Sequence, residues 1–235
     1  MTFDEVLRAL EGMGSEQTKS TYVRHGAKEP FFGVKIGDMK KLVKEVKKDQ
    51  ELVYKLYDSG NHDAMYLAGL TVNPKTVTKE MLRHWVKQAY WYSLAEYTVA
   101  NVTAESPFAR ELAVEWMQSP EEMVAVAGWS AYANYVTIAP DEELDLMEIR
   151  RLLEQVKKTV HEERNRVRYT MNTFVICVAS YVLPLTEEAK AVAEAIGAVK
   201  VDVGDTACKV PLASGYIAKV EARGKIGTKK KTCIC

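Results

Sequence analysis

Short helical patterns follow one another along most of this 235-residue chain, and nearly every one ends at a tight break. The apolar residues Met39, Leu42 and Val46 recur at helical spacing, for example, while lysines occupy the opposite face of the same segment. The next pattern ends at Ser59 and Gly60, which favour a turn. Later segments of this kind are predicted over residues 108–117, 120–136, 144–160, 163–182 and 186–196. Such a succession favours an all-helical architecture.

Alternation typical of a strand occurs only at residues 199–203, and it is short. Residues 61–69 and 119–128 resemble each other, because both open with a polar cap, continue with small apolar residues and contain a glycine where another helix could approach. Self-similarity of this kind is typical of stacked antiparallel helix pairs, since one pair cannot bury its own apolar face. We predict an all-α superhelical solenoid of HEAT-like repeats over residues 1–214, followed by a last helix and a basic tail over residues 215–235.

The charges balance, with 32 Lys and Arg residues against 32 Asp and Glu residues. No global field therefore attracts nucleic acid or an anionic membrane, and any site for a polyanion must be local. The apolar run around residues 174–178 is far shorter than the roughly 20 residues of a membrane span, and the chain opens on a helix pattern instead of a leader. We expect a cytoplasmic monomer without a membrane partner.

The sequence gives no signal for a metal or a nucleotide cofactor. Its four cysteines are few and unevenly placed, its four histidines are isolated, and it contains no CxxC, P-loop, GxGxxG or HExxH motif. Cys208 stands beside Lys209, whose charge could lower the pKa of the thiol and activate it as a nucleophile. The alternative is a structural loop that closes the last repeat.

Three aromatic residues, Tyr90, Trp91 and Tyr92, follow the helix pattern around residues 81–86. Consecutive residues on a helix point about 100° apart, so the three rings cannot all enter one core. One interpretation is a platform on which bases stack, an interaction worth roughly 1–3 kcal/mol per base in single-stranded complexes. The other is that Trp91 fills a helix interface and the tyrosines line its rim.

A family resemblance rests on residues 33–42, residues 56–64 and Trp91 after its helix. In pattern and order, residues 6–182 resemble the DNA alkylation repair family, the AlkD-type proteins. The resemblance implies a right-handed HEAT-like solenoid that holds damaged duplex DNA in a concave basic groove. It also implies hydrolytic release of positively charged purines alkylated at N3 or N7.

The catalytic positions depart from that family pattern. Active members carry an aspartate four residues after the tryptophan that Trp91 matches, and this chain has Ala95 there. Glu96 follows, but one helical step turns a side chain by about 100°, away from the expected direction unless the helix starts differently. A second tryptophan of the family corresponds here to Thr173 or Phe174. Trp91 and Glu96 are the candidate catalytic residues, and glycosylase activity is left open.

Cationic and aromatic side chains supply the candidate DNA contacts. Arg164, Arg166 and Arg168 alternate before a very apolar helix, where they could bind phosphate or lie on a solvated surface. The tail after Gly215 has six basic residues and one acidic residue, so it could neutralise phosphates or remain disordered. The candidate nucleic-acid-binding residues are Tyr90, Tyr92, Lys40, Lys41, Arg164, Arg166, Arg168, Lys209, Lys225, Lys229, Lys230 and Lys231.

Three hypotheses about function follow. The leading one is a DNA-binding protein that resembles the alkylpurine glycosylases. The second is a non-catalytic HEAT-like scaffold for a protein partner, favoured by the zero net charge and by Ala95. The third is an enzyme with another reaction, centred on Cys208 or Glu96. A large exposed apolar patch would favour the second, and gathered cations and aromatic rings would favour the first.

Overall fold

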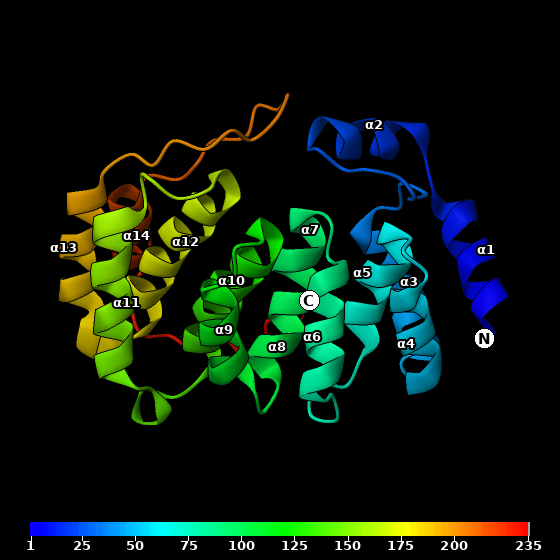
Figure 1. Ribbon diagram of the computed structural model, residues 1–235, viewed down its shortest axis with the longest axis horizontal. Coiled ribbons are helices and arrows are strands. Elements are labelled where there is room, and N and C mark those ends of the chain that lie inside the picture. Colours follow the sequence, from blue (N-terminus) through cyan, green and yellow to red (C-terminus); the bar gives the residue numbers. More distant parts are fainter. Residues whose placement is uncertain (235) are drawn as a thin grey trace.

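The computed structural model describes residues 1–234, which form helices and connections without a strand in that range. Figure 1 shows the helices side by side along an arc from α1 to α13 and α14. The elements are α1 (Phe3–Met13), α2 (Glu16–Arg24), α3 (Ile36–Val46), α4 (Gln50–Asp58), α5 (His62–Thr71), α6 (Lys79–Gln88), α7 (Tyr92–Leu94), the π-helix η1 (Ala95–Val99), α8 (Ala100–Glu105), α9 (Ala109–Met117), α10 (Glu122–Ile138), the 3₁₀ turn η2 (Asp141–Glu143), α11 (Leu146–Thr159), α12 (Asn165–Tyr181), the 3₁₀ turn η3 (Leu183–Leu185), α13 (Thr186–Ile196) and α14 (Ala213–Ala222). The all-α prediction is confirmed, and the expected boundary at residue 214 falls within α14.

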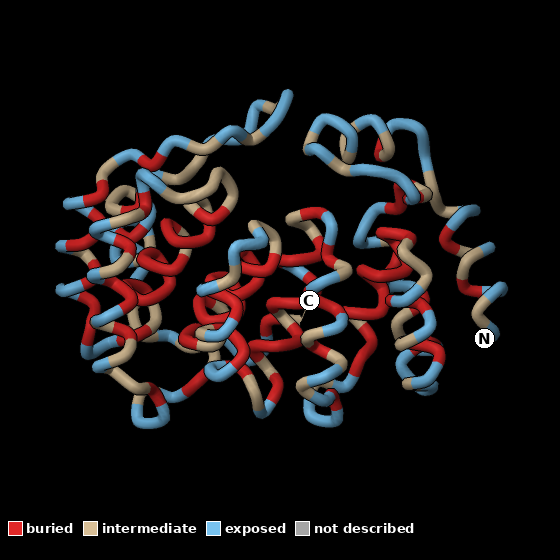
Figure 2. Tube along the Cα trace, in the orientation of Figure 1, coloured by how far each residue is buried: buried red, intermediate tan, exposed pale blue. Residues whose placement is uncertain are grey.

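From α4 onward the helices form two layers. Helices such as α6 and α11 are amphipathic and keep one face in solvent, whereas α10 and α12 are buried over most of their surface. We call α4, α6, α9, α11 and α13 the outer layer, and α5, α7–η1–α8, α10, α12 and α14 the inner layer. Successive inner helices pack against one another, as α10 does against α8 and α12. Figure 2 shows burial concentrated in these pairs and falling off at α2 and after α13.

Two glycines allow the close helix approaches that the sequence predicts. A Cβ on Gly69 would lie 2.5 Å from the Thr98 methyl group on η1, and one on Gly128 would lie 2.6 Å from the Met117 backbone nitrogen on α9. Any larger side chain at either position would push the helices apart. The repeated small-residue pattern therefore sets the spacing between helices.

Among the described residues, no single helix is long and apolar enough to cross a membrane. Helix α12 together with the segment Leu183–Ile196 passes the same length and composition test, but the two are bent by 112°.

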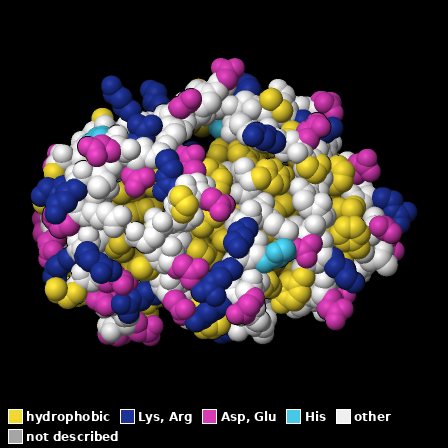
Figure 3. Space-filling view, in the orientation of Figure 1, with side chains coloured by type: hydrophobic (Ala, Val, Ile, Leu, Met, Phe, Trp, Pro, Cys, Tyr) yellow, Lys and Arg dark blue, Asp and Glu magenta, His cyan; other side chains and the backbone are white. Residues whose placement is uncertain are grey.

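A ladder of ion pairs joins consecutive outer helices and reaches α14. In each pair a cation on one helix meets a carboxylate on the next helix or, for Asp145, on its N-cap, at N···O distances of 2.6–2.8 Å. The pairs are Lys79–Glu111, Arg83–Glu115, Arg110–Asp145, Arg150–Glu188 and Lys190–Glu221. Figure 3 accordingly shows positive and negative side chains interspersed over the outer face. Five cations of the outer layer are therefore neutralised by neighbouring helices, and each exposed pair contributes only about 0.2–1 kcal/mol.

A buried carboxylate attaches the N-terminal part of the chain to the stack. Asp63 on α5 is fully buried, and its two oxygens accept the backbone N–H groups of Phe32, Gly33 and Val34 at 2.6, 3.0 and 3.1 Å. Asn61 caps the same helix, because its side chain accepts the Asp63 and Ala64 N–H groups. The loop that follows α2 is thereby held against α5.

Residues 197–212, which we call the 197–212 loop, extend away from the stack between α13 and α14 (Figure 1, orange). The short alternating run at residues 199–203 forms no strand, because no neighbouring strand in the described chain supplies a hydrogen-bonding partner. Asn165 fixes the loop instead: its amide donates to the Asp202 carbonyl and accepts the Asp202 N–H, both at 2.8 Å. At Gly204, where φ is +77°, an added Cβ would lie 2.5 Å from the Arg24 carbonyl oxygen. The loop therefore touches the end of α2.

The basic C-terminal segment, residues 225–234, folds back on the helices instead of forming a free arm. Lys229 Nζ pairs with Asp141 at 2.8 Å and donates to the Val136 carbonyl at 2.9 Å. Glu105 Oε1 accepts the Cys233 and Ile234 N–H groups. The last carbonyls of α10 and α12 have no partner within their helices, and this segment supplies N–H donors to them. The tail is therefore ordered over residues 225–234, and one of its candidate phosphate-binding lysines, Lys229, is engaged by the protein itself. Cys235 lies outside the described residues.

Candidate functional site

The three aromatic residues lie at the start of an inner-layer element, where Tyr90 and Trp91 precede α7 and Tyr92 is its first residue. Trp91 is the extended N-cap of α7, so the rings of Tyr90, Trp91 and Tyr92 point in different directions. The Trp91 side chain is only 7% exposed, its Nε1 donates to the His25 carbonyl at 3.0 Å, and its ring packs on His62 at a centroid distance of 4.8 Å. Trp91 is therefore held by the end of α2 and forms the floor of the cavity described next. Tyr90 and Tyr92 lie beside it and are more exposed.

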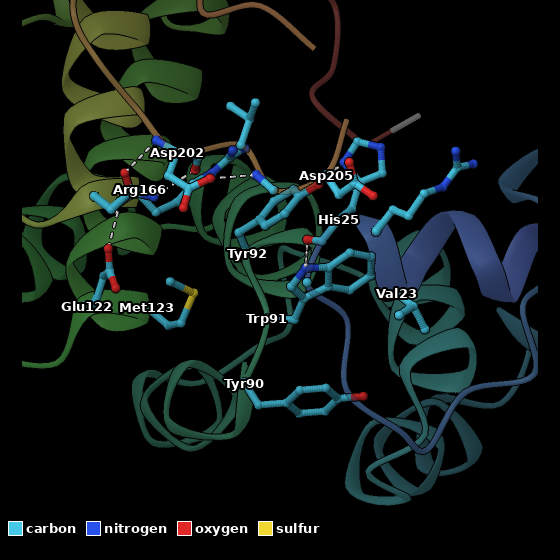
Figure 4. A pocket seen from close by; sticks show the side chains of 15 residues that line it. Val23, His25, Tyr90, Trp91, Tyr92, Glu122, Met123, Arg166, Asp202 and Asp205 are labelled. Atoms are coloured by element: carbon cyan, nitrogen blue, oxygen red, sulfur yellow. Dashed lines mark hydrogen bonds between the residues drawn. The ribbon is translucent and has the colours of Figure 1, made fainter. Parts of the chain in front are cut away.

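A cavity of about 600 Å³ opens over this floor. Its walls come from the end of α2, the N-terminal ends of α7, α10 and α12, and the tip of the 197–212 loop, as Figure 4 shows. The lining residues are Val23, Arg24, His25, Gly26, Tyr90, Trp91, Tyr92, Glu122, Met123, Asn165, Arg166, Asp202, Val203, Gly204 and Asp205. Because Arg24 and Gly204 are in contact, the cavity is bridged on the side of α2 and the loop.

Glu96 faces the inner layer because the helix changes pitch at this point. The π-helix at Ala95–Val99 inserts a wider turn, which alters the directions that regular α geometry would give. Ala95 is fully buried, whereas Glu96, 5% exposed, points toward α12. The sequence led us to expect a carboxylate aimed away from the place that a sugar would occupy, unless the helix starts differently; in the structure the carboxylate faces Arg166 of α12. Glu96 lines a small pocket between η1, α8, α10 and α12, separate from the cavity over Trp91.

The Glu96 carboxylate is fully engaged by Arg166. One oxygen accepts Arg166 Nε and the other accepts Nη2, the latter at 2.9 Å. The guanidinium carbon lies 3.8 Å from the centroid of the Tyr92 ring and 4.0 Å from that of Tyr169, so the cation is enclosed between two aromatic faces. Burial raises the pKa of Glu96, and the bonds from Arg166 oppose that rise. Burial acts to lower the pKa of Arg166, and the Glu96 bonds outweigh it, leaving the pKa raised.

The other candidate cations have separate positions. Arg164 donates to the Ser119 and Pro120 carbonyls at 2.9 and 2.8 Å, which ties the start of α12 to the turn before α10. Arg168 donates to Asn165, and Lys209 is exposed on the 197–212 loop. Exposed Lys40 and Lys41 lie on α3, where Lys41 pairs with Asp38, and neither lines the cavity. Lys225 and Lys231 are exposed, and the Lys230 ammonium lies 5.3 Å from the Tyr181 ring centroid.

Sequence reasoning missed several residues of this region. Tyr97 and Tyr169 flank the ion pair, and His25 joins Tyr92 by a 3.1 Å hydrogen bond between Nδ1 and the tyrosine hydroxyl. Tyr97 belongs to the aromatic run that begins at Tyr90, and Tyr169 follows the alternating arginines directly, so composition carried a signal for both. His25 carried none, because it reaches the site from a helix 67 residues away in sequence.

We expect the cysteines Cys177 and Cys208 to differ in thiol reactivity. Burial raises the pKa of Cys177 to about 11, so only about 0.1% of this thiol ionises at pH 8, whereas Cys208 is exposed. Brief iodoacetamide treatment of the folded protein at pH 8, read by peptide mass spectrometry, should label Cys208 and leave Cys177 unmodified until urea is added. Labelling of Cys208 no faster than that of an unstructured cysteine peptide removes the support for a reaction centred on it.

Comparisons with known proteins agree with this architecture. The profile described as "DNA alkylation repair enzyme" matches residues 6–189. The uncharacterized protein Lmo0209 of Listeria monocytogenes is 33% identical over 230 residues, which cover 96% of this chain and all of that protein. Uncharacterized protein Lin0241 of Listeria innocua is 33% identical over 228 residues, 95% of this chain and 99% of its own length.

One solved structure matches over the whole of both chains, with 38% identity and a TM-score of 0.92. It is described as "A new family of proteins related to the HEAT-like repeat DNA glycosylases with affinity for branched DNA structures". The match supports the HEAT-like assignment of the helix pairs.

Proposed function

Because the chain belongs to the DNA alkylation repair family, we propose that it binds DNA at the cavity over Trp91 and prefers branched DNA to a continuous duplex. The full-length likeness to a protein from a family with affinity for branched DNA structures supports this proposal. The proposal includes binding of damaged duplex DNA, which the sequence led us to expect, with a lower affinity than that for branched DNA.

The bridged cavity is the observation that carries the proposal. Helices α10 and α12 direct their N-termini toward it, and helix N-termini favour phosphate groups. At α12 the Glu122 carboxylate already accepts the Arg166 backbone N–H at 2.7 Å, so this role falls to α10. Tyr90, which is 37% exposed, offers a ring face on which a base can stack, whereas the Arg166 guanidinium already covers one face of Tyr92. The contact between Arg24 and Gly204 spans one side, where it obstructs a straight duplex, whereas separated strands at a branch can enter from the open side.

We further propose that binding is not followed by hydrolysis of the glycosidic bond. Ala95 provides no carboxylate, and the Glu96 carboxylate already neutralises Arg166 through two hydrogen bonds. A carboxylate engaged in this way gives little additional stabilisation to positive charge that develops on a sugar. The protein would then recognise structure in DNA without removing a base.

The test compares a four-way junction with a linear duplex built from the same strands, by fluorescence anisotropy at 50 and 200 mM salt. We expect the junction to bind at least about 10-fold more tightly, with both affinities falling as salt rises. A parallel assay with N7-methylguanine DNA should release no base above background. Equal affinities for the two DNA forms contradict the branch preference, and base release contradicts the loss of catalysis.

A further inference from the structure

Two small pockets on the inner layer lie beside the cavity over Trp91, and they adjoin each other. One, of about 120 Å³, lies between η1, α8, α10 and α12, and the other, of about 240 Å³, lies between η1, α12 and the 197–212 loop. Tyr97 and Tyr169 line both, so the two pockets adjoin each other at these rings, and we call the two pockets together the depression.

The two ends of this depression differ in chemistry. The larger end is lined by Arg166, Lys209 and His25, and no carboxylate of the described chain lines it. The smaller end presents neutral polar groups from Asn101 and Asn134, and its one carboxylate, Glu96, is neutralised by Arg166. The depression is thus cationic at one end and amide-rich at the other, with aromatic faces between them.

Hydrogen-bonding capacity remains at both ends. Arg166 uses Nε and one Nη2 N–H for Glu96, which leaves three of its five N–H groups without a partner in residues 1–234. Asn134 donates to Asn101 Oδ1 at 2.8 Å, and Asn101 donates to the Tyr97 carbonyl at 2.9 Å. These two hydrogen bonds fix both side-chain amides and leave Asn134 Oδ1 and a second Asn101 Nδ2–H without a partner among the described residues.

The ring of Tyr97 is available to a ligand. Tyr97 is 45% exposed although it stands between two buried residues, Glu96 and Thr98. Burial of its hydroxyl end raises the pKa of Tyr97, so the ring stays neutral at physiological pH. A neutral, partly exposed ring beside fixed cations suits a flat base attached to a phosphate.

We propose that this depression binds one unpaired nucleotide of a branched DNA. This inference rests on the proposed function. The base stacks on Tyr97 with its edge toward Asn101 and Asn134, and its phosphate meets Arg166 and Lys209. The ligand class is therefore a single-stranded nucleotide next to a branch point. Forks and flaps with unpaired nucleotides at the branch should bind more tightly than a four-way junction in which every base is paired.

The experiment places 2-aminopurine at the first unpaired position of a forked DNA and follows its fluorescence and the anisotropy of a distal dye. With the native protein, binding should quench the 2-aminopurine signal, because stacking on an aromatic ring does so. Tyr97→Leu should abolish the quenching and weaken fork binding roughly 10-fold, the scale of one lost stacking contact. Tyr97→Phe should retain both properties, since it keeps the ring.

Two further variants separate this site from the rest of the DNA surface. Tyr216→Leu removes an equally exposed tyrosine on α14, outside both pockets, and should leave quenching and affinity unchanged. Lys209→Gln should weaken fork binding and reduce the slope of log affinity against log salt by about 1. If Tyr97→Leu behaves like Tyr216→Leu while the fork still binds, the nucleotide site is wrong and the proposed function stands. If neither fork nor junction binds, both proposals fail.

Discussion

Replacing Glu96 by alanine is expected to lower the free energy of unfolding by about 3–5 kcal/mol. The substitution leaves the Arg166 guanidinium enclosed between Tyr92 and Tyr169 without a counter-charge, and its side chain is only 12% exposed. Removing one partner of a buried ion pair is costly, because the remaining charge has already lost its water. Urea unfolding followed by circular dichroism measures this change directly.

A double variant tests whether the cost comes from the unpaired charge. Glu96→Leu combined with Arg166→Met replaces the whole pair by apolar side chains of similar size, and such replacements are often nearly neutral. We therefore expect the double variant to recover most of the lost stability. Arg83→Ala, which breaks an exposed pair of the outer ladder, is the control and should cost no more than about 1 kcal/mol. A loss below 1 kcal/mol for Glu96→Ala would show that the pair contributes little to the fold.

The contact between Glu96 and Arg166 could not be predicted from the sequence. Glu96 and Arg166 were each recognised as candidates, but for separate roles, because they are 70 residues apart and no local pattern couples them. The π-helix that turns Glu96 toward α12 has no signature in composition, since its residues Ala95–Val99 read as an ordinary helix. Helical periodicity, in contrast, correctly indicated the buried face of α3 at Met39, Leu42 and Val46.

The position of the C-terminal segment could not be predicted, for a related reason. Its lysines and glycines are typical of a disordered arm, and composition is the only local information there. Its partners are the unpaired carbonyls at the ends of α10 and α12, together with Glu105, which is 128 residues from Cys233. Only the assembled stack brings these acceptors to one place, so Lys229 binds protein where the sequence suggested phosphate.

Asp63→Ala is expected to cost a further large amount, about 3–5 kcal/mol, because three backbone N–H groups lose their acceptor together. The loop at residues 31–34 would then detach from α5, and with it the end of α2 whose His25 carbonyl holds Trp91.

Hydrogen exchange should reveal this effect as faster exchange at Phe32, Gly33 and Val34, together with a lower urea midpoint. Asp58→Ala is the matched control, since Asp58 lies exposed on the preceding helix and pairs only with His84 among the described residues, so its loss should cost below about 1 kcal/mol. Unchanged exchange at residues 32–34 in Asp63→Ala would mean that contacts other than the carboxylate hold the loop. Because Trp91 depends on the same attachment, the variant should also lose affinity for branched DNA under conditions in which the rest of the stack remains folded.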